Sequence, residues 1–116
     1  MLLKSLLDLK KDIVIGLGEI GIVLYKLFSK SHIIEGFDIN PKLIPKNLKK
    51  NELLQVRFLH ICIPYTKNFN SQIIKLEKKF QPQGIIIHST IKPSTTFNIQ
   101  KKLQIPVIYS ATRGVH

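Results

Sequence analysis

Apolar and polar positions come in blocks along this chain, and the blocks predict strands separated by helices. Short continuous apolar runs are typical of strands that are buried on both faces of a sheet. Five such runs are present: Ile13–Ile15, Ile33–Asp38, Phe58–Ile63, Gly84–Ser89 and Pro106–Ser110. Between most of these runs the apolar residues recur every three or four positions, which is the period of a helix with one buried face.

This helical period predicts three helices. The first carries an apolar stripe that we expect to pack on the sheet: Ile20, Val23, Leu24, Leu27 and Phe28. The second carries a similar stripe and ends before Pro82: Phe69, Ile73, Leu76 and Phe80. The third is a long helix over Thr95–Leu103. Residues 40–52 contain two prolines and several lysines, which favours a loop with at most a short helix.

A glycine motif follows the first apolar run directly. Gly16-Leu17-Gly18-Glu19-Ile20-Gly21 has the G-x-G-x-x-G spacing of a dinucleotide-binding turn between a strand and a helix. In order, the three glycines permit a tight turn, the approach of a pyrophosphate and close packing of helix on strand. The backbone N–H groups from Gly18 to Gly21, including those of Glu19 and Ile20, would hold the pyrophosphate. The Glu19 carboxylate is expected to point to solvent, and a merely structural turn is the alternative.

Asp38 ends the second apolar run, at about the separation expected for an acid that binds the adenosine ribose. Its carboxylate would accept hydrogen bonds from the ribose hydroxyls. A 2′-phosphate at the same place would meet like charge, which opposes NADP by roughly 1–3 kcal/mol. The residue therefore favours NAD as the cofactor. The alternative is that Asp38 only initiates the turn at Ile39-Asn40-Pro41.

The alternation of strand and helix, with right-handed crossovers, predicts an α/β fold in a single domain. We expect a Rossmann-type doubly wound parallel sheet of about five strands, ordered 3-2-1-4-5, with its ligand crevice at the carboxyl ends of the strands. A chain of 116 residues leaves no room for a second domain of ordinary size. We interpret residues 1–12 as an N-terminal extension and residues 13–116 as the nucleotide-binding domain.

The chain is strongly basic, with 18 Lys and Arg residues against 7 Asp and Glu and a net charge of +11. Such a field attracts anions, including dinucleotides, nucleotide sugars and nucleic acid. The lysines are spread along the chain without interleaved aromatic residues, so dedicated nucleic-acid binding is not expected. Any DNA binding should be weak and lost near physiological salt.

Cys62 is the only cysteine, which excludes an internal disulfide and a cluster of metal-binding thiolates. Its place within an apolar run favours a buried, inert thiol over a nucleophile. No metal site is expected. The N-terminal leucines are interrupted by charged residues, so the sequence predicts neither a secretory nor a membrane-spanning segment, and a cytoplasmic location follows as the default.

The four histidines are not assigned to catalysis. His60 and His88 lie within apolar strand runs, where a hydrogen-bonded structural role is favoured. His32 begins a strand and is expected to be solvated. His116 has no evident partner for proton transfer.

Two segments resemble a known family. His60-Ile61-Cys62-Ile63-Pro64 and Ser89-Thr90-Ile91-Lys92-Pro93-Ser94-Thr95-Thr96 are similar to the I-C-V-P and S-T-V-P-P-G-T-T segments of the UDP-glucose/GDP-mannose dehydrogenase family. The broader 6-phosphogluconate-dehydrogenase-like group shares the glycine loop and the third-strand pattern. The resemblance spans roughly residues 13–110 and implies an NAD-binding domain. It also implies that Ile63 and Pro64 pass beside the ribose and phosphates, and that Thr90 lies near the nicotinamide.

The chain also departs from the family pattern. Lys92 and Ser94 replace a proline and a glycine, although Ser94 suits a helix start, and Tyr65 replaces a threonine. Thr112 stands where the family has a catalytic glutamate, and a threonine cannot serve as a general base there. We therefore assign no catalytic residue in this chain. The family's substrate domain, which supplies a cysteine nucleophile and a lysine, is not among these 116 residues.

These features predict the NAD-binding domain of a nucleotide-sugar dehydrogenase-like oxidoreductase, inactive on its own. Its substrate would be an anionic nucleotide sugar, bound together with a missing or separate domain. The alternative is a stand-alone module that binds or senses NAD(H) without catalysis.

Overall fold

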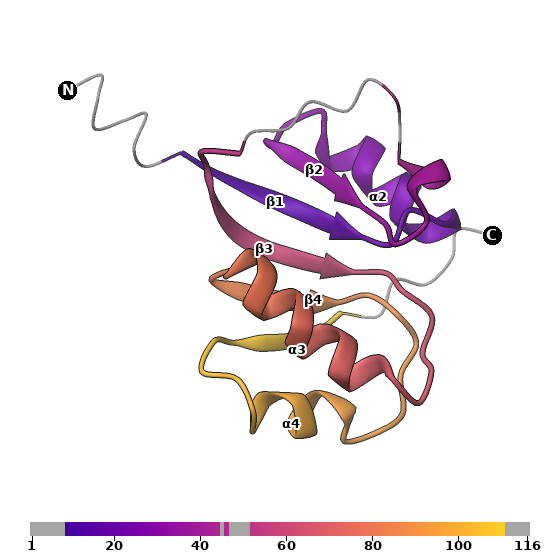
Figure 1. Ribbon diagram of the computed structural model, residues 1–116, viewed down its shortest axis with the longest axis vertical. Helices are drawn as coiled ribbons and strands as arrows, with labels where there is room; N and C mark the ends of the chain where they lie inside the picture. The colour runs from indigo at the N-terminus through magenta and orange to yellow at the C-terminus, as the bar shows by residue number, and fades with distance from the viewer. Residues whose placement is uncertain (1–8, 45, 47–51, 111–116) are drawn as a thin grey trace.

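Five parallel strands form one sheet in the computed structural model, which describes residues 9–44, 46 and 52–110 (Figure 1). The strands are Lys10–Ile15 (β1), Ile34–Phe37 (β2), Gln55–Ile61 (β3), Gly84–Ile87 (β4) and Val107–Tyr109 (β5). The helices are Glu19–Phe28 (α2), Phe69–Phe80 (α3) and Thr95–Gln100 (α4), with a 3-10 turn at Pro41–Leu43 (η1). The α/β class and the parallel five-stranded sheet are confirmed. The expectations for residues 1–8, Thr112 and His116 fall outside the described residues.

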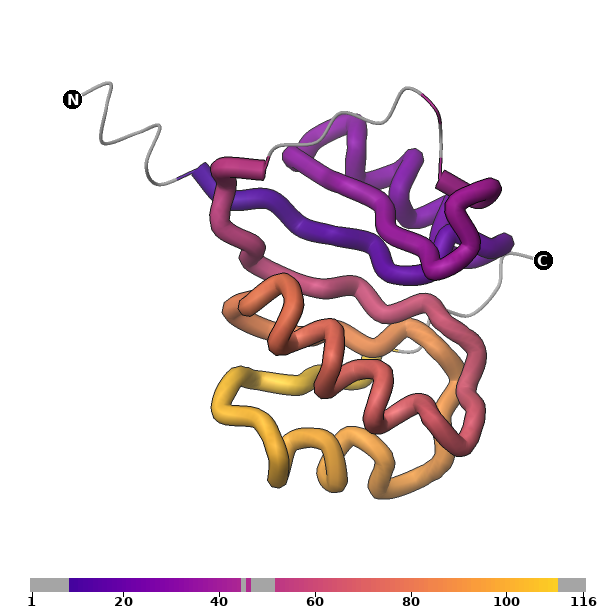
Figure 2. The backbone as a smooth tube through the Cα atoms, viewed as in Figure 1, coloured from indigo at the N-terminus to yellow at the C-terminus, as the bar shows by residue number. Residues whose placement is uncertain are grey.

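The strand order is β2-β1-β3-β4-β5, so the predicted order 3-2-1-4-5 is wrong. Figure 2 shows β2 and β3 on either side of β1. Two adjacent charges of β1 favour its two neighbours, because Lys11 pairs with Glu35 of β2 and Asp12 pairs with Arg57 of β3. Both β1 residues are buried, and a buried charge without a partner is costly. The ligand crevice remains at the carboxyl ends, because the strand order still reverses beside β1.

Side chains of β1 alternate between two hydrophobic cores on opposite faces of the sheet. Ile13 and Ile15 belong to the larger core, which includes Phe69 and Ile73 of α3 and Ile99 of α4. Val14 points to the other face, where a smaller core contains residues of α2 and β2. Helices therefore cover both faces, α2 on one side and α3 with α4 on the other (Figure 1). This two-sided cover explains why the strands are nearly continuous apolar runs.

Helix α2 packs on the sheet with only part of its predicted stripe. Leu24 is buried and Phe28 is partly buried, but three members of the predicted stripe are exposed by 39 to 58%: Ile20, Val23 and Leu27. The rotation of the helix is set by Gly21, which must face the preceding turn because a Cβ there would lie 1.6 Å from the Gly16 carbonyl oxygen. Residues three and seven positions after Gly21 then face the sheet.

Two strands begin earlier than their apolar runs. β1 starts at Lys10, three residues before Ile13, and β3 starts at Gln55. The polar beginnings of the two strands pair with each other, Lys10 opposite Gln55 and Lys11 opposite Val56. Residues 10–12 thus belong to the sheet, although their polarity predicted an extension outside it.

Helix α4 is shorter than predicted and ends at Gln100 instead of Leu103. The side chain of Gln100 accounts for this end. Its Nε2 donates to the carbonyl oxygens of Leu103 and Ile105, at 3.2 and 2.8 Å, and its Oε1 accepts the N–H of Val107 at 2.8 Å. The Gln100 amide thus forms hydrogen bonds with backbone groups in the link from α4 to β5. If the helix continued, some of these groups would bond within the helix instead.

Ser94 begins α4 in a left-handed conformation, with φ of 68°. It occupies the expected N-cap position, but its side chain makes no capping hydrogen bond. A left-handed conformation is unfavourable for every residue with a Cβ, and glycine adopts it readily. The backbone at this position thus suits the glycine that the family pattern places there.

We predict that Ser94→Gly raises the free energy of unfolding by about 0.5 to 1 kcal/mol, because it relieves the left-handed strain. Chemical denaturation measures the change. Ser94→Ala is the matched control, since it removes the same hydroxyl but keeps the Cβ, and it should give no gain. Equal stabilities of the glycine and alanine variants would contradict the prediction.

Candidate functional site

A cleft of about 830 Å³ opens at the carboxyl ends of β1 to β4, a size typical of cofactor sites. All of the predicted cofactor-binding residues except Gly21 line it: Gly16, Gly18, Glu19, Ile20, Asp38, Ile63, Pro64 and Thr90. They come from the glycine turn, the end of β2 and the segments after β3 and β4. The fold therefore brings together residues that are far apart in the sequence.

Two glycines of the motif are required by the protein itself. Gly16 has φ of 92°, and a Cβ there would lie 3.0 Å from the carbonyl carbon and oxygen of Cys62. Gly21 is buried against the Gly16 carbonyl, so it packs the helix onto the turn and does not line the cleft. These are the tight-turn and helix-packing roles that the spacing predicts.

Gly18 is different, because no neighbouring atom requires a glycine there. A Cβ on Gly18 would have nothing within 4 Å, and its φ of −73° is accessible to any residue. Gly18 is exposed on the cleft lining and is the N-cap of α2, without a side-chain capping bond. The missing side chain therefore leaves the backbone at the start of α2 accessible from the cleft.

The first turn of α2 faces the cleft through Glu19 and Ile20, and both residues are exposed. The first N–H groups of a helix have no partner within the helix, and the helix dipole adds positive potential at this end. The arrangement suits an anionic group held by backbone amides.

Asp38 ties the end of β2 to the glycine turn. Its Oδ2 accepts the N–H of Leu17 at 2.7 Å, and its Oδ1 accepts the N–H of Asn40 at 2.8 Å. The bond to Asn40 is the turn-initiating contact considered above. The bond to Leu17 joins residues that are 21 positions apart in the sequence. A carboxylate accepts about four hydrogen bonds, so these two leave capacity for ligand hydroxyls.

The other end of the cleft is built by the segments that follow β3 and β4. Ser89 Oγ donates to the carbonyl oxygen of Ile63 at 2.5 Å, which holds the two segments together. Thr90 follows Ser89 and is exposed on the lining. Cys62 also reaches the lining, but burial raises the pKa of its thiol to about 12. The thiol is therefore protonated at neutral pH and is a poor nucleophile.

Two parts of the cleft were not predicted from the sequence. One part is a wall formed by α3, through Gln72, Lys75 and Leu76. The other part is a side formed by the segment after β2, through Ile39 and Leu43. The three α3 residues lie at helical spacing, which predicts a shared face but not what that face meets. Ile39 is 76% exposed, and an isoleucine in the turn predicted at Ile39-Asn40-Pro41 was the available signal in the sequence.

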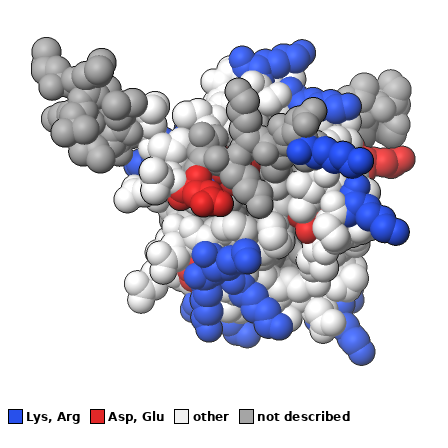
Figure 3. Space-filling model, turned by 45° about the horizontal axis from the view of Figure 1, so that its top comes forward, with Lys and Arg blue, Asp and Glu red and all other residues white. Residues whose placement is uncertain are grey.

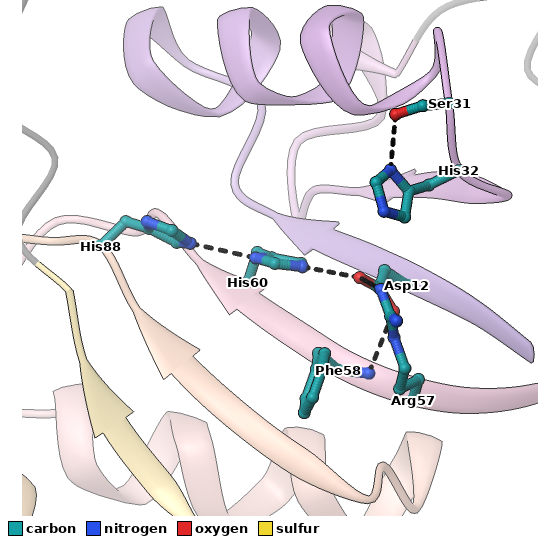
Figure 4. A network of polar contacts seen from close by, with 7 residues as sticks. All are labelled: Asp12, Ser31, His32, Arg57, Phe58, His60 and His88. Carbon is teal, nitrogen blue, oxygen red and sulfur yellow. Dashed lines mark hydrogen bonds and ion pairs between the residues drawn. The ribbon is translucent and has the colours of Figure 1, made fainter.

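A row of polar side chains crosses three strands beneath α2 (Figure 4). Asp12 Oδ2 lies 3.0 Å from His60 Nε2, and His60 Nδ1 lies 3.0 Å from His88 Nε2. Arg57 donates to both Asp12 oxygens, at 3.0 and 2.9 Å. The hydrogen-bonded role expected for His60 and His88 is confirmed, whereas the part of Asp12 was not predicted. His32 is exposed, as expected, and contacts Ser31 Oγ.

Burial and hydrogen bonding shift two pKa values in this row. Burial alone would raise the pKa of Asp12, but hydrogen bonds and charges from His60 and Arg57 outweigh it and lower the pKa to about 2. Burial lowers the pKa of His88 to about 4, with a further contribution from His60. At neutral pH the row therefore contains an ionised Asp12 and a neutral His88.

Lys and Arg side chains lie at several separate places on the face shown in Figure 3. Among the described residues, no His, Cys, Asp and Glu side chains gather in a group of three or more that could hold a metal ion. Within the same part of the chain, no helix is long and apolar enough to cross a membrane.

Acid should destabilise the protein in two steps. Between pH 6.5 and 4 the unfolded chain takes up a proton at His88 that the folded chain does not, which lowers the free energy of unfolding by about 2 to 3 kcal/mol. Between pH 3.8 and 2 the unfolded chain takes up a proton at Asp12 that the folded chain does not, which lowers the free energy of unfolding by about 2 kcal/mol more. Urea denaturation at pH 7 and pH 4.5 measures the first step. His88→Gln should lose most of this pH dependence, and equal pH slopes of the two proteins would contradict the assignment.

Comparison with known proteins adds no relative to this picture: no family model, no curated protein and no solved structure matches the chain. A fold of this class hosts many unrelated functions, so the fold alone does not determine the ligand. The function is therefore argued from the geometry of the cleft and from the motifs that line it.

Proposed function

We propose that this chain is an NAD(H)-binding domain and that the coenzyme occupies the cleft at the carboxyl ends of the strands. The observation that carries the proposal is Gly18. The backbone demands glycine at Gly16, and packing demands it at Gly21, but no atom of the described protein demands it at Gly18. Close approach of a pyrophosphate is the physical reason for a glycine at that place in the motif.

The cleft supplies a suitable group for each part of the coenzyme. The N–H groups at the start of α2 would hold the pyrophosphate, and the Asp38 carboxylate would accept hydrogen bonds from the adenosine ribose. Ile63 and Pro64 would border the middle of the coenzyme, and Thr90 would lie near the nicotinamide. All of these residues line one cleft, which supports a single ligand in contact with all of them.

The resemblance to the UDP-glucose/GDP-mannose dehydrogenase family extends the proposal to an oxidoreductase. The domain would present NAD to an anionic nucleotide sugar bound by another domain or chain, in the cytoplasm. The positive charge of the chain, +11, would favour the approach of both anions. This part of the proposal rests on the sequence segments around Pro64 and Thr90.

A second candidate function is binding of NAD(H) without catalysis. It is favoured by the chemistry of the cleft, because the lining within the described residues contains no histidine, and its thiol has a pKa raised to about 12. Neither a histidine base nor a thiolate is then available in the cleft near neutral pH. Formation of NADH with a nucleotide sugar, followed by absorbance, distinguishes the two candidates.

Replacing Gly18 with Val should abolish NAD binding and leave the fold intact, because a Cβ at this position has no protein atom within 4 Å but would block the pyrophosphate. Calorimetric titration measures binding, and circular dichroism follows the fold. Gly21→Ala is the contrasting variant and should unfold the chain or greatly lower its melting temperature. Undiminished NAD binding by Gly18→Val would refute the proposed site.

The chain should bind NAD at least tenfold more tightly than NADP, because the Asp38 carboxylate would repel a 2′-phosphate. Titration with both coenzymes tests this. Asp38→Asn keeps an oxygen acceptor for the Leu17 N–H while it removes the charge, so the preference should shrink. Equal or tighter binding of NADP by the wild type would refute the assignment of Asp38.

A further inference from the structure

The polar row from Asp12 to His88 contains no residue that the proposed coenzyme contacts, yet it ends beside the cleft. Asp12 lies on β1, His60 on β3, and His88 directly follows β4 (Figure 4). All three residues are at least 92% buried. The rings of His60 and His88 are stacked, with centroids 5.2 Å apart, and Phe28 of α2 lies over His60 at 4.8 Å. His60 is thus enclosed between the sheet and α2.

The charge of Asp12 determines which atom is the donor in the first hydrogen bond of the row. An ionised carboxylate only accepts, so His60 Nε2 carries the proton that it shares with Asp12 Oδ2. His60 Nδ1 and His88 Nε2 share a second proton across 3.0 Å. His88 also has a hydrogen bond with the backbone of Ser110, just after β5. His88 is therefore held from two sides, by a side chain from β3 and by backbone after β5.

His88 is followed directly by the two residues that the segment after β4 contributes to the cleft. Ser89 bonds to the carbonyl oxygen of Ile63, and Thr90 is exposed on the lining. The N–H of His88 donates to the carbonyl oxygen of Ile61 at 2.8 Å, which continues the β3–β4 pairing to the edge of the cleft. The position of His88 thus determines where Ser89 and Thr90 leave the sheet.

This end of the cleft is separate from the end at Asp38. In the order β2-β1-β3-β4, the end of β2 and the end of β4 are three strand spacings apart, which is roughly 14 Å. A change at His88 therefore acts on one half of an extended dinucleotide and leaves the contacts of the other half in place.

We propose that His88, held by His60 and Asp12, is a positioning residue that sets the Ser89–Thr90 segment against the nicotinamide half of the coenzyme. The inference rests on the proposed function. If the row had a purely structural role, replacing His88 would lower the stability of the fold and would weaken the binding of both halves of the coenzyme together. If the row has a positioning role, replacing His88 weakens the binding of NAD. The binding of AMP, which contains only the adenosine half, stays unchanged.

The test compares dissociation constants of NAD and AMP, measured by NMR titration, for the wild type, His88→Leu and His88→Gln. His88→Leu should raise the dissociation constant of NAD about fivefold, which is the effect of one lost hydrogen bond. It should change the dissociation constant of AMP by less than twofold. His88→Gln should restore most of the NAD affinity, because its amide places a polar atom near the position of Nε2. Equal effects of His88→Leu on both ligands, or no effect on NAD, would overturn the inference.

A second measurement needs no variant and applies if His88→Leu fails to fold. NAD should shift the imidazole resonances of His88 in the wild type more than AMP does at equal saturation, and equal shifts would overturn the inference. A wild-type chain that binds neither ligand would refute the proposed function, and the inference with it. A chain that binds both ligands with no selective response at His88 would refute the inference alone.

Discussion

Two adjacent buried charges on β1 tie this strand to both of its neighbours in the sheet. Lys11 pairs with Glu35 of β2, with Nζ and Oε2 2.6 Å apart, and Asp12 pairs with Arg57 of β3 at 2.9 Å. Successive residues of a strand point to opposite faces, so one charge is neutralised on each side of the sheet. Leaving either one unpaired would cost several kcal/mol, and within the described residues no buried side-chain nitrogen or oxygen lacks a partner. Both charges are paired because β1 lies between β2 and β3.

The central place of β1 also positions the cleft. Where the chain leaves β1, the N–H of Cys62, just after β3, donates to the carbonyl oxygen of Ile15 at 2.8 Å, and Asp38, just after β2, accepts the N–H of Leu17. The glycine turn is thus held from both neighbouring strands. A rigid turn with its amides already oriented loses little entropy when an anion binds, which is why such a site suits a phosphate group.

The contact between Gly21 and the Gly16 carbonyl extends the same constraint to α2. It rotates the helix so that Phe28 covers His60, and it leaves Val23 and Leu27 exposed on the outer side. One close approach of backbone to backbone therefore shapes the start of the cleft and encloses the polar row beneath the helix. The row in turn connects β1 to the far end of the cleft.

The sequence by itself determined the local features of this protein. Apolar runs and helical stripes located the strands and helices, and the spacing of Gly16, Gly18 and Gly21 located the turn, because these features depend on backbone sterics and on periods of a few residues. Only the tertiary structure decided the neighbour of each strand, the rotation of α2 and the row that joins Asp12 to His88. These depend on pairing between residues far apart in the chain. A charged residue beside an apolar run looks like an exposed boundary until its partner on another strand is known, and for Asp12 that partner, Arg57, lies 45 residues away.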